Sequence, residues 1–498
     1  MRFLLPLLLF LSAVLSLPGC EPKEDVLTTD SSAKLEFSSD TVKFDTVFVT
    51  VGTVTKRLWV YNRNRRAVRV EEISLQSRPG VTYSLLVNGD AGPAARNVEI
   101  RGRDSLLVLV RATIDPTPAA GKPFLVEDDL RFRTNGNDQQ VKVLGYGQNA
   151  YFHDSEVLPC NVVWRNDKPH VIFNSVLVDS ACTLTIEAGT RVYSHAGSFL
   201  VVRGRLLVNP TLAPTGELKP DSREFVRFQG DRLEEQYNDV PGQWGGIQFG
   251  PSSAGNVVRF AEIKNASFAL FIVNLRNRQP RPQVRVENCV IQNISSAPFA
   301  LAGGVNLAGA ALLSISGDFA VRNTLLTNCA EHAVWAVQGG EYSFDYCTIA
   351  NYTGRRETPS VLLANGIRIN GQPGPLVAPR LTMRNSIVVG SEKDELELVN
   401  GEQYASGISI RNTLLRTEKY AQTGPLALTG NGNVLNPTAS IFKSTPQRPR
   451  GRGFDYQLDT LSPASNQGLP LPTLRTDLLL RPRDAQRPDL GAYERKNP

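Results

Sequence analysis

The sequence of 498 residues is poor in the residues that most often build catalytic and metal centres. It holds four histidines, and His153, His170, His195 and His332 are scattered singly along the chain. Its six cysteines match no zinc-binding spacing, so we expect no metal and no cofactor. The net charge is only +6 and no run of five like charges occurs, which gives no support to a nucleic-acid partner.

Long apolar runs are also missing after the first twenty residues. No later segment is apolar over about 18 residues, so no further spanning helix is expected. From about residue 156, no amphipathic helix of about ten residues separates the short apolar segments. Glycine (40) and proline (32) are plentiful, and hydrophobic residues make up 41% of the chain. This composition is typical of a folded, turn-rich β-protein.

The first twenty residues have the organisation of an export signal. Arg2 precedes a leucine-rich stretch, Phe3 to Val14, which is too short and wrongly flanked for a stable spanning helix. Leu17-Pro18-Gly19-Cys20 then resembles a lipobox, where a signal peptidase cuts before a cysteine that carries diacylglycerol. The resemblance implies a signal peptide over residues 1–19 and a membrane bound through a lipid on Cys20. The alternative is an ordinary secretory signal with a chance cysteine.

Residues 20–34 form a polar tether after the lipidated cysteine. Lys23-Glu24-Asp25 resembles the tag that sends Bacteroidota lipoproteins to the outer face of the outer membrane. A solvated linker with chance charges is the alternative. The resemblance implies an outer-membrane protein that faces the cell exterior. Export also exposes the remaining cysteines to an oxidising compartment.

Residues 35–150 show the period-two alternation of β-strands separated by turn signals. The spacing predicts an all-β sandwich of roughly seven strands. The module resembles the Ig-like N-terminal modules of Bacteroidota surface proteins. That resemblance rests on three motifs: Phe44-Asp45-Thr46-Val47-Phe48, Asp104-Ser105-Leu106 and Phe132-Arg133-Thr134-Asn135-Gly136.

An internal repeat dominates residues 151–430. Six segments align on one anchor position, occupied by Phe260, Asn288, Asn323, Tyr346, Asn385 and Asn412. The residues two before and three after the anchor are apolar in every copy, and the residue directly after it is small. Successive side chains of a straight strand point to opposite faces, so two residues five positions apart cannot both face inward from one strand. Since both apolar columns are expected to face inward, a bend lies between two strands. A repeated strand–bend–strand unit with variable loops is typical of a β-helix.

The bend positions favour asparagine, which tolerates a left-handed backbone and can hydrogen-bond to its copy one coil away. Five places after the anchor, four copies form a structural asparagine column: Asn265, Asn293, Asn328 and Asn351. The repeat, with Leu184 to Thr190 and Gln243 to Ile247, resembles a right-handed parallel β-helix of the pectate-lyase-like type. Arg487 to Glu494 resembles the closing segment of such proteins, which implies that residues 431–498 fold back and cap the last coil.

Charged residues directly precede the anchor and are expected to form an outward ladder: Arg259, Glu287, Arg322, Asp345, Arg384 and Arg411. The first five alternate in sign, which favours pairing between coils over a basic face for an acidic glycan. Among the cysteines, Cys289 and Cys347 share a column two coils apart, beyond disulfide reach. Cys160 and Cys182 flank the first coil, and the sequence leaves open whether they are bridged.

The coils lack the catalytic sets of the enzymes that share this fold. Neither a calcium-binding group of acids with a basic residue nor clustered aspartates is found, and the catalytic residues are unknown. We expect a non-catalytic surface lipoprotein that presents its β-helix to a glycan or a surface protein. The alternatives are a polysaccharide lyase or glycoside hydrolase with a divergent site, and a structural envelope protein.

Overall fold

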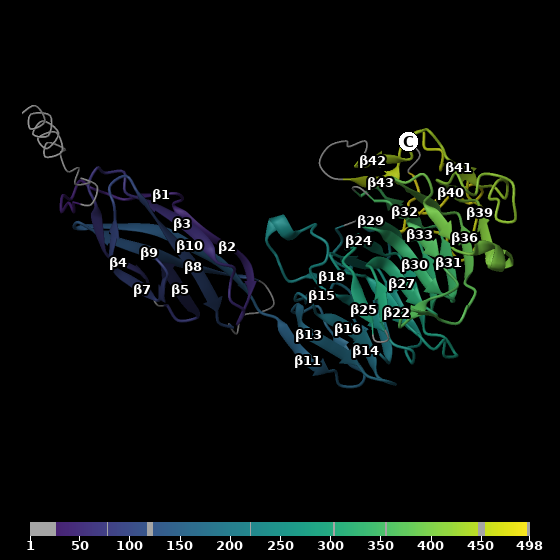
Figure 1. Cartoon of the computed structure of the whole chain (residues 1–498), viewed down its shortest axis with the longest axis horizontal. Helices are drawn as coiled ribbons and strands as arrows, with labels where there is room; N and C mark the ends of the chain where they lie inside the picture. The colour runs from purple at the N-terminus through teal and green to yellow at the C-terminus, as the bar shows by residue number, and fades with distance from the viewer. Residues whose placement is uncertain are drawn as a thin grey trace, which may run out of the picture. The chain divides into compact units, whose positions relative to one another are not determined.

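The computed structural model describes residues 26–76, 78–116, 123–219, 221–301, 304–353, 356–446 and 454–495. The expected signal peptide, Cys20 and Lys23-Glu24-Asp25 lie outside these residues. The chain divides into two compact units, with the boundary between Asn149 and Ala150. Both are built almost wholly of β-strands, as predicted (Figure 1). No described helix is long and apolar enough to cross a membrane.

The N-terminal unit consists of two five-stranded sheets. The first has the order β1 (Glu36–Phe37), β3 (Lys56–Tyr61), β8 (Ser105–Ile114), β5 (Val81–Val87) and β6 (Asp90–Gly92). The second has the order β2 (Thr41–Phe48), β10 (Asn137–Gln148), β9 (Phe124–Thr134), β4 (Val68–Leu75) and β7 (Ala94–Ile100). All pairings are antiparallel except that of β2 with β10. The ten strands exceed the predicted seven because β1, β6 and β7 are short or carry few buried residues.

Alternation explains the core of this unit. In β8 every second side chain is buried, and the same pattern recurs in β9 and β10. Leu58 and Val108 from one sheet and Phe132 and Val141 from the other belong to one buried cluster. The sheets therefore pack face to face with polar residues on their outer sides.

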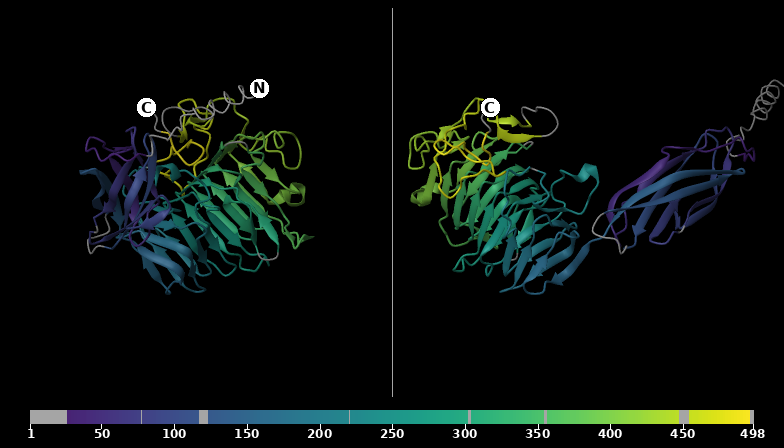
Figure 2. Two further views of the ribbon diagram at one scale, coloured as in Figure 1. Left: turned by 60° about the vertical axis from the view of Figure 1, so that its left-hand side comes forward. Right: turned by 180° about the vertical axis from the view of Figure 1, so that it is seen from behind.

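The second unit is a β-helix-like solenoid in which three parallel ladders run through successive coils (Figure 2). The first ladder contains β12 (Val162–Trp164), β14 (Thr183–Ile186), β17 (Arg205–Val208), β20 (Asn256–Arg259), β23 (Gln283–Glu287), β28 (Asp318–Arg322), β31 (Glu341–Asp345), β36 (Arg380–Arg384) and β39 (Ile408–Arg411). The second contains β15 (Arg191–Ser194), β18 (Val226–Gly230), β21 (Ala261–Lys264), β24 (Val290–Ile294), β29 (Leu325–Cys329), β32 (Thr348–Asn351), β37 (Ile387–Gly390), β40 (Leu414–Leu415) and β41 (Val434–Leu435). The third contains β11 (Tyr151–Val157), β16 (Phe199–Val202), β19 (Gly246–Phe249), β22 (Leu270–Val273), β27 (Ala310–Ile315), β30 (His332–Gln338), β33 (Val361–Leu363) and β38 (Leu396–Leu398), and the long β13 (His170–Val178) joins both of the last two.

Smaller elements decorate these ladders. They are the antiparallel pairs β25 (Phe299–Leu301) with β26 (Val305–Leu307), β34 (Arg368–Ile369) with β35 (Gln372–Pro373) and β42 (Phe442–Ser444) with β43 (Asp455–Leu458), and the 3₁₀ helices η2 (Glu235–Tyr237) and η3 (Gly401–Gly407). Because β41 pairs in parallel with β40, the solenoid continues beyond the predicted boundary at residue 430.

All six anchor positions form the bend between the first and second ladders. Each has a left-handed backbone, with φ between 43° at Phe260 and 52° at Asn288 and Tyr346. The two flanking apolar columns lie inside the solenoid core, where Val258 and Ile263 have no exposed surface. Asn209, directly after β17, has the same conformation (φ 53°) and is a further copy that the alignment missed.

The C-terminal segment corrects the expectation of an end cap. Residues 464–495, here called the strap, run along the side of the coils over the anchor bends. The amide of Asn412 donates to Gln467 O (3.3 Å), that of Asn385 to Leu469 O (2.8 Å) and that of Asn288 to Leu478 O (3.0 Å). The order is antiparallel to the stacking of the coils, so the strap follows the flank instead of covering the last coil.

The strap buries apolar side chains on the outside of the second ladder. Leu325, Ile387 and Leu414 point away from the solenoid core and join Leu490 and Tyr493 of the strap in a separate buried cluster. Without the strap these positions would expose apolar surface along several coils. The segment is therefore an integral part of the fold.

Candidate functional site

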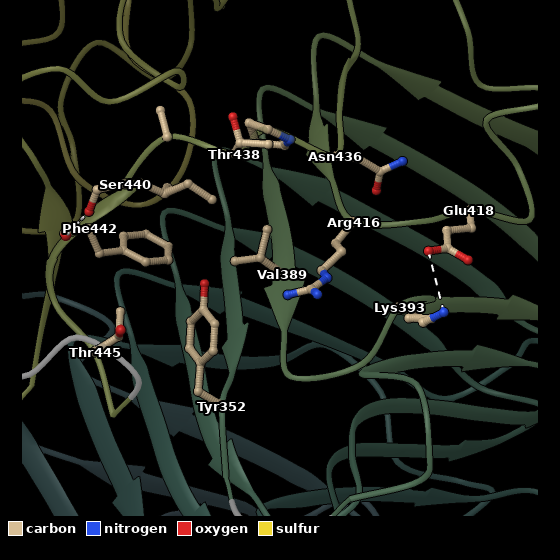
Figure 3. Close-up of a pocket in the computed structure, with 13 residues that line it drawn as sticks. Tyr352, Val389, Lys393, Arg416, Glu418, Asn436, Thr438, Ser440, Phe442 and Thr445 are labelled. Carbon is tan, nitrogen blue, oxygen red and sulfur yellow. Dashed lines mark hydrogen bonds and ion pairs between the residues drawn. The ribbon is translucent and has the colours of Figure 1, made fainter.

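A hollow of about 470 Å³ lies on the outside of the last coils (Figure 3). One wall follows the ends of neighbouring strands: Tyr352 comes directly after β32, and Val389 belongs to β37. Arg416 and Asn436 follow β40 and β41. Because these strands are parallel neighbours, their ends bring the side chains to one place. We call this site the Arg416 hollow.

Residues 437–442 form the opposite wall. The Phe442 ring lies edge-on to the Tyr352 ring, with centroids 6.5 Å apart, and edge-on to Tyr456 at 5.4 Å. Phe442 is almost fully buried, whereas Tyr352 is half-buried and contributes its ring to the hollow. The wall is thus apolar at its base and fixed by aromatic packing.

Polar groups line the rest. The Lys393 ammonium and the Glu418 carboxylate form an exposed ion pair at 3.8 Å on the rim. The Asn436 side chain is held by Thr417, since its oxygen accepts from Thr417 N (2.8 Å) and its nitrogen donates to Thr417 O (2.6 Å). Asn436 is therefore a positioned wall residue with little hydrogen-bonding capacity left.

Arg416 differs from its neighbours because most of its donors are unused. Its Nη1 donates to Gly390 O (3.0 Å), and it makes no ion pair with any carboxylate in the described part of the chain. Figure 3 shows Arg416 and Tyr352 pointing toward one another across Val389. A guanidinium carries five N–H donors in a planar fork, so it can bind hydroxyl, carbonyl or acidic oxygens of a ligand.

The hollow offers binding groups more than catalytic ones. Glu418 is the one carboxylate among its lining residues, and hydrolysis of a glycosidic bond ordinarily needs two. Within the described ranges, no group of three or more His, Cys, Asp or Glu side chains is arranged to hold a metal ion.

The predicted charge ladder lies in register in the first ladder, at one position in six successive strands. Arg259 contacts Glu287 at 3.3 Å, and Arg322 lies between Glu287 (3.7 Å) and Asp345 (4.0 Å). Arg384 binds Asp345 through two hydrogen bonds of 2.7 and 2.8 Å. The alternating signs therefore pair between coils.

Exposure and pairing vary along the ladder. The Asp345 side chain is only 6% exposed, because arginines cover it from both neighbouring coils. The Arg411 side chain has no carboxylate partner among the described residues, and its neighbour in register is the like-charged Arg384. Both acidic members of the ladder therefore pair with arginines of the neighbouring coils, whereas Arg411 does not pair within the ladder.

The asparagine column has three members that act alike. Asn293 donates to Asn265 Oδ1 and Asn328 donates to Asn293 Oδ1, both at 3.3 Å, and all three have a left-handed backbone. The column also fixes the loop that contains η2, because the amide of Asn265 donates to Asn238 O (2.9 Å) directly after that helix. Asn351 follows Asn328 in register but makes different contacts: its oxygen accepts from Cys329 N (2.9 Å) and its amide donates to Glu331 O (2.8 Å).

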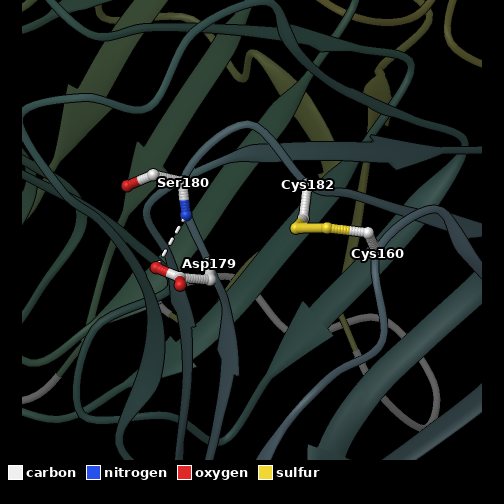
Figure 4. The surroundings of a disulfide bond; sticks show 4 residues. All are labelled: Cys160, Asp179, Ser180 and Cys182. Atoms are coloured by element: carbon white, nitrogen blue, oxygen red, sulfur yellow. Dashed lines mark hydrogen bonds between the residues drawn. A yellow bond between two sulfur atoms is a disulfide. The ribbon is translucent and has the colours of Figure 1, made fainter.

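The cysteines have structural positions. Cys160 and Cys182 form a disulfide with Cα atoms 4.6 Å apart, which ties the segment after β11 to the turn before β14 (Figure 4). Cys289, Cys329 and Cys347 are buried free thiols. Burial raises the pKa of the Cys289 and Cys329 thiols to about 12 and that of Cys347 further, so none is a thiolate nucleophile at neutral pH.

The scattered histidines also have structural partners. His153 and His170 are joined by a 3.0 Å ring-nitrogen contact and stack on Trp164, which fills the first coil. Burial lowers the pKa of His170 and of His332 to about 4, so both are neutral at pH 7. The His332 Nδ1 donates to Pro359 O (2.7 Å). His195 pairs with Asp231 at 2.6 Å.

Sequence reasoning did not find the Arg416 hollow. Its residues belong to different loops and to the wall at residues 437–442, so no repeated column marks them. The strap left a signal that was overlooked: two places after the anchor, where an outward residue stands, four of six copies are apolar, namely Val290, Leu325, Ile387 and Leu414.

Comparisons with known proteins leave the family open. No family model and no curated protein matches the chain. A protein of unknown function from Porphyromonas gingivalis W83 has a TM-score of 0.18 and 12% identity over 26% of this chain and 51% of its own. A family 123 glycoside hydrolase from Clostridium perfringens has a TM-score of 0.17 and 8% identity over 24% and 30%. The chain spans about half of the first structure and a third of the second, and no argument rests on either.

Proposed function

We propose that this chain is a lipid-anchored protein of the outer membrane, facing the cell exterior, whose solenoid binds a glycan without catalysing a reaction. The observation that carries the proposal is the Arg416 hollow. It joins the Tyr352 ring to a guanidinium with unused donors in a space of about 470 Å³. Sugars present apolar ring faces and polar edges, which an aromatic ring and a hydrogen-bonding fork match respectively.

The architecture suits a surface protein. We infer that the solenoid is a right-handed β-helix of the pectate-lyase-like type, since parallel strands with crossover connections are almost always right-handed. We infer that the N-terminal unit is an Ig-like sandwich that acts as a stalk. Its chain enters at the β1 end and leaves after β10, a strand of 12 residues that spans roughly 40 Å.

A glycan-binding assay tests the proposal. The mature chain would be screened against arrayed acidic and neutral polysaccharides, and hits would be titrated by calorimetry. We expect Tyr352→Ala and Arg416→Gln each to weaken binding by about tenfold or more, from lost ring contact and lost charge-assisted hydrogen bonds. The control Arg276→Gln removes an exposed arginine elsewhere on the solenoid and should leave the affinity unchanged.

One observation favours a second candidate, a polysaccharide lyase or hydrolase with a divergent site. Lys393, Arg416 and Glu418 all line the same hollow. Incubation with the polysaccharides that bind, with and without calcium, would release unsaturated or reducing ends if the chain were an enzyme. Such release, abolished by Arg416→Gln, would replace the non-catalytic proposal. Absence of binding to any glycan or surface protein would favour a structural envelope protein.

A further inference from the structure

Two loops at one end of the N-terminal unit carry five exposed arginines. Residues 62–67, between β3 and β4, contain Arg63, Arg65 and Arg66, and residues 101–104, between β7 and β8, contain Arg101 and Arg103. We call this surface the arginine end.

The buried side chain of Asn62 fixes the two loops side by side. Its Nδ2 lies within hydrogen-bond distance of Arg66 O (2.8 Å), Ile100 O (3.0 Å) and Arg101 O (2.9 Å). Arg103 N also donates to Asn64 O at 2.9 Å. The arginines thus project from a rigid double loop and not from a flexible tail.

Three of these five arginines have no carboxylate partner among the described residues. Arg63 pairs with Glu36 at 3.2 Å, and the Asp104 carboxylate accepts from Ser105 N at 2.7 Å. The side chains of Arg65, Arg66 and Arg103 have no ion pair with any carboxylate that the structure describes. The like charges of such a cluster repel one another, and a multiply charged anionic ligand would offset this repulsion.

The chain enters the unit at this end. Thr28 N donates to Ala67 O (2.9 Å) and Ala67 N donates to Val26 O (3.0 Å), so residues 26–28 lie against the first arginine loop. Val26 is six residues after Cys20, and six extended residues span at most about 21 Å. A lipid on Cys20 therefore keeps the arginine end close to the membrane surface, whereas β10 carries the chain to the opposite end of the unit.

We propose that the arginine end is a membrane-docking surface that binds the phosphates of anionic lipid headgroups in the membrane that holds Cys20. The proposal rests on the lipid anchor proposed above. Guanidinium groups bind phosphate oxygens in a bidentate manner. A lipid with several acyl chains anchors the protein without a second attraction, but contacts between the arginines and the headgroups would also orient the protein on the membrane. Docking would hold the stalk in one orientation on the membrane and direct β10 away from it.

Vesicle co-sedimentation tests the surface without the lipid. The mature chain with Cys20→Ser would be mixed with vesicles of phosphatidylcholine alone or with half phosphatidylglycerol. We expect binding to the anionic vesicles only, weakened by raising salt from 50 to 500 mM. Arg65→Gln, Arg66→Gln and Arg103→Gln together should reduce the partition constant on the order of 100-fold, from roughly fivefold per arginine near the surface.

The control removes the same charge elsewhere, through Arg57→Gln, Arg276→Gln and Arg278→Gln, which are exposed. Equal loss in the control, or equal binding to both kinds of vesicle, would overturn the proposal. Binding to anionic vesicles that appears only after Glu24→Gln and Asp25→Asn would also overturn the proposal. The arginine end would then bind the acidic tether of its own chain and not the membrane. Intact-mass measurement of the native protein reports the lipid on Cys20 separately, so failure of the anchor and failure of the docking surface are distinguishable.

Discussion

The N-terminal unit and the solenoid bury apolar strands in different ways. In the N-terminal unit two sheets face each other, and its buried cluster is formed by alternating apolar residues. In the solenoid the chain turns between three ladders in each coil, so it needs sharp bends. Residues with a left-handed backbone, such as Asn323 and Asn385, form these bends. The solenoid therefore depends on polar side chains at its bends and loops, while the N-terminal unit depends mainly on the alternation of its strands.

The largest effect is expected from the buried ion pair of the solenoid. Arg356 Nη2 contacts Glu395 Oε1 at 2.6 Å, and both side chains are fully buried. Arg356→Met would leave the carboxylate charged and unpaired and should cost the solenoid about 3–5 kcal/mol. The control is the exposed pair of Arg69 with Glu99 in the N-terminal unit, where Arg69→Met should cost less than about 1 kcal/mol.

Urea unfolding, monitored in each unit by hydrogen exchange, measures the loss of stability in both variants. A loss below about 1 kcal/mol for Arg356→Met would contradict the dependence of the solenoid on buried polar groups.

The second-largest effect is expected from lowering the pH, which should destabilise the solenoid. All four histidines lie in that unit, and His170 and His332 have a pKa lowered by burial from 6.5 to about 4. The unfolded chain binds more protons than the folded one between these values, so stability is lost as the pH falls from about 6.5 to 4. Each histidine contributes up to roughly 3 kcal/mol.

The N-terminal unit, which has no histidine, should show no loss from this cause in the same window. His332→Asn keeps a donor toward Pro359 O without titrating, and it should flatten part of the pH dependence of the solenoid's unfolding midpoint. If the unfolding midpoint of this variant depends on pH as steeply as that of the parent chain, the assignment to His332 is refuted.

The bends should give an intermediate effect. Asn385 has φ 51°, and its amide both donates to Leu469 O (2.8 Å) and accepts from Leu469 N (2.9 Å) in the strap. Asn385→Ala adds backbone strain to these lost bonds and should cost about 2–3 kcal/mol. Asn385→Gly relieves the strain and should recover about 1 kcal/mol of that loss. Equal stability of the two variants by chemical unfolding would show that the bend does not select the residue.

The smallest expected effect is a gain. Arg411 continues the ladder next to the like-charged Arg384, without a carboxylate partner in the described residues. Arg411→Glu would extend the alternation of signs and should stabilise the solenoid by about 0.5 kcal/mol. The control is Arg57→Glu in the N-terminal unit, where the exposed Arg57 lies opposite the uncharged Leu109 of β8. A destabilising Arg411→Glu would break the view that the ladder pairs between coils.

The features that sequence alone predicted are those that repeat. Six anchors, two apolar columns and a charge column recur in six successive coils, so each copy supports the others, and the structure places them in register. The strap and the Arg416 hollow were not predicted because each joins segments far apart in the chain. Tyr352 and Phe442, for example, are neighbours only because residues 437–442 return to the ends of the second ladder.

The proposed glycan site is tested most directly by calorimetric titration of an array-selected oligosaccharide into the mature chain and into its Arg416→Gln variant. The account predicts saturable binding to the parent chain, an affinity at least about tenfold weaker in the variant, and unchanged thermal unfolding of both. Equal affinity of the two chains would contradict the account, because the glycan would then bind elsewhere.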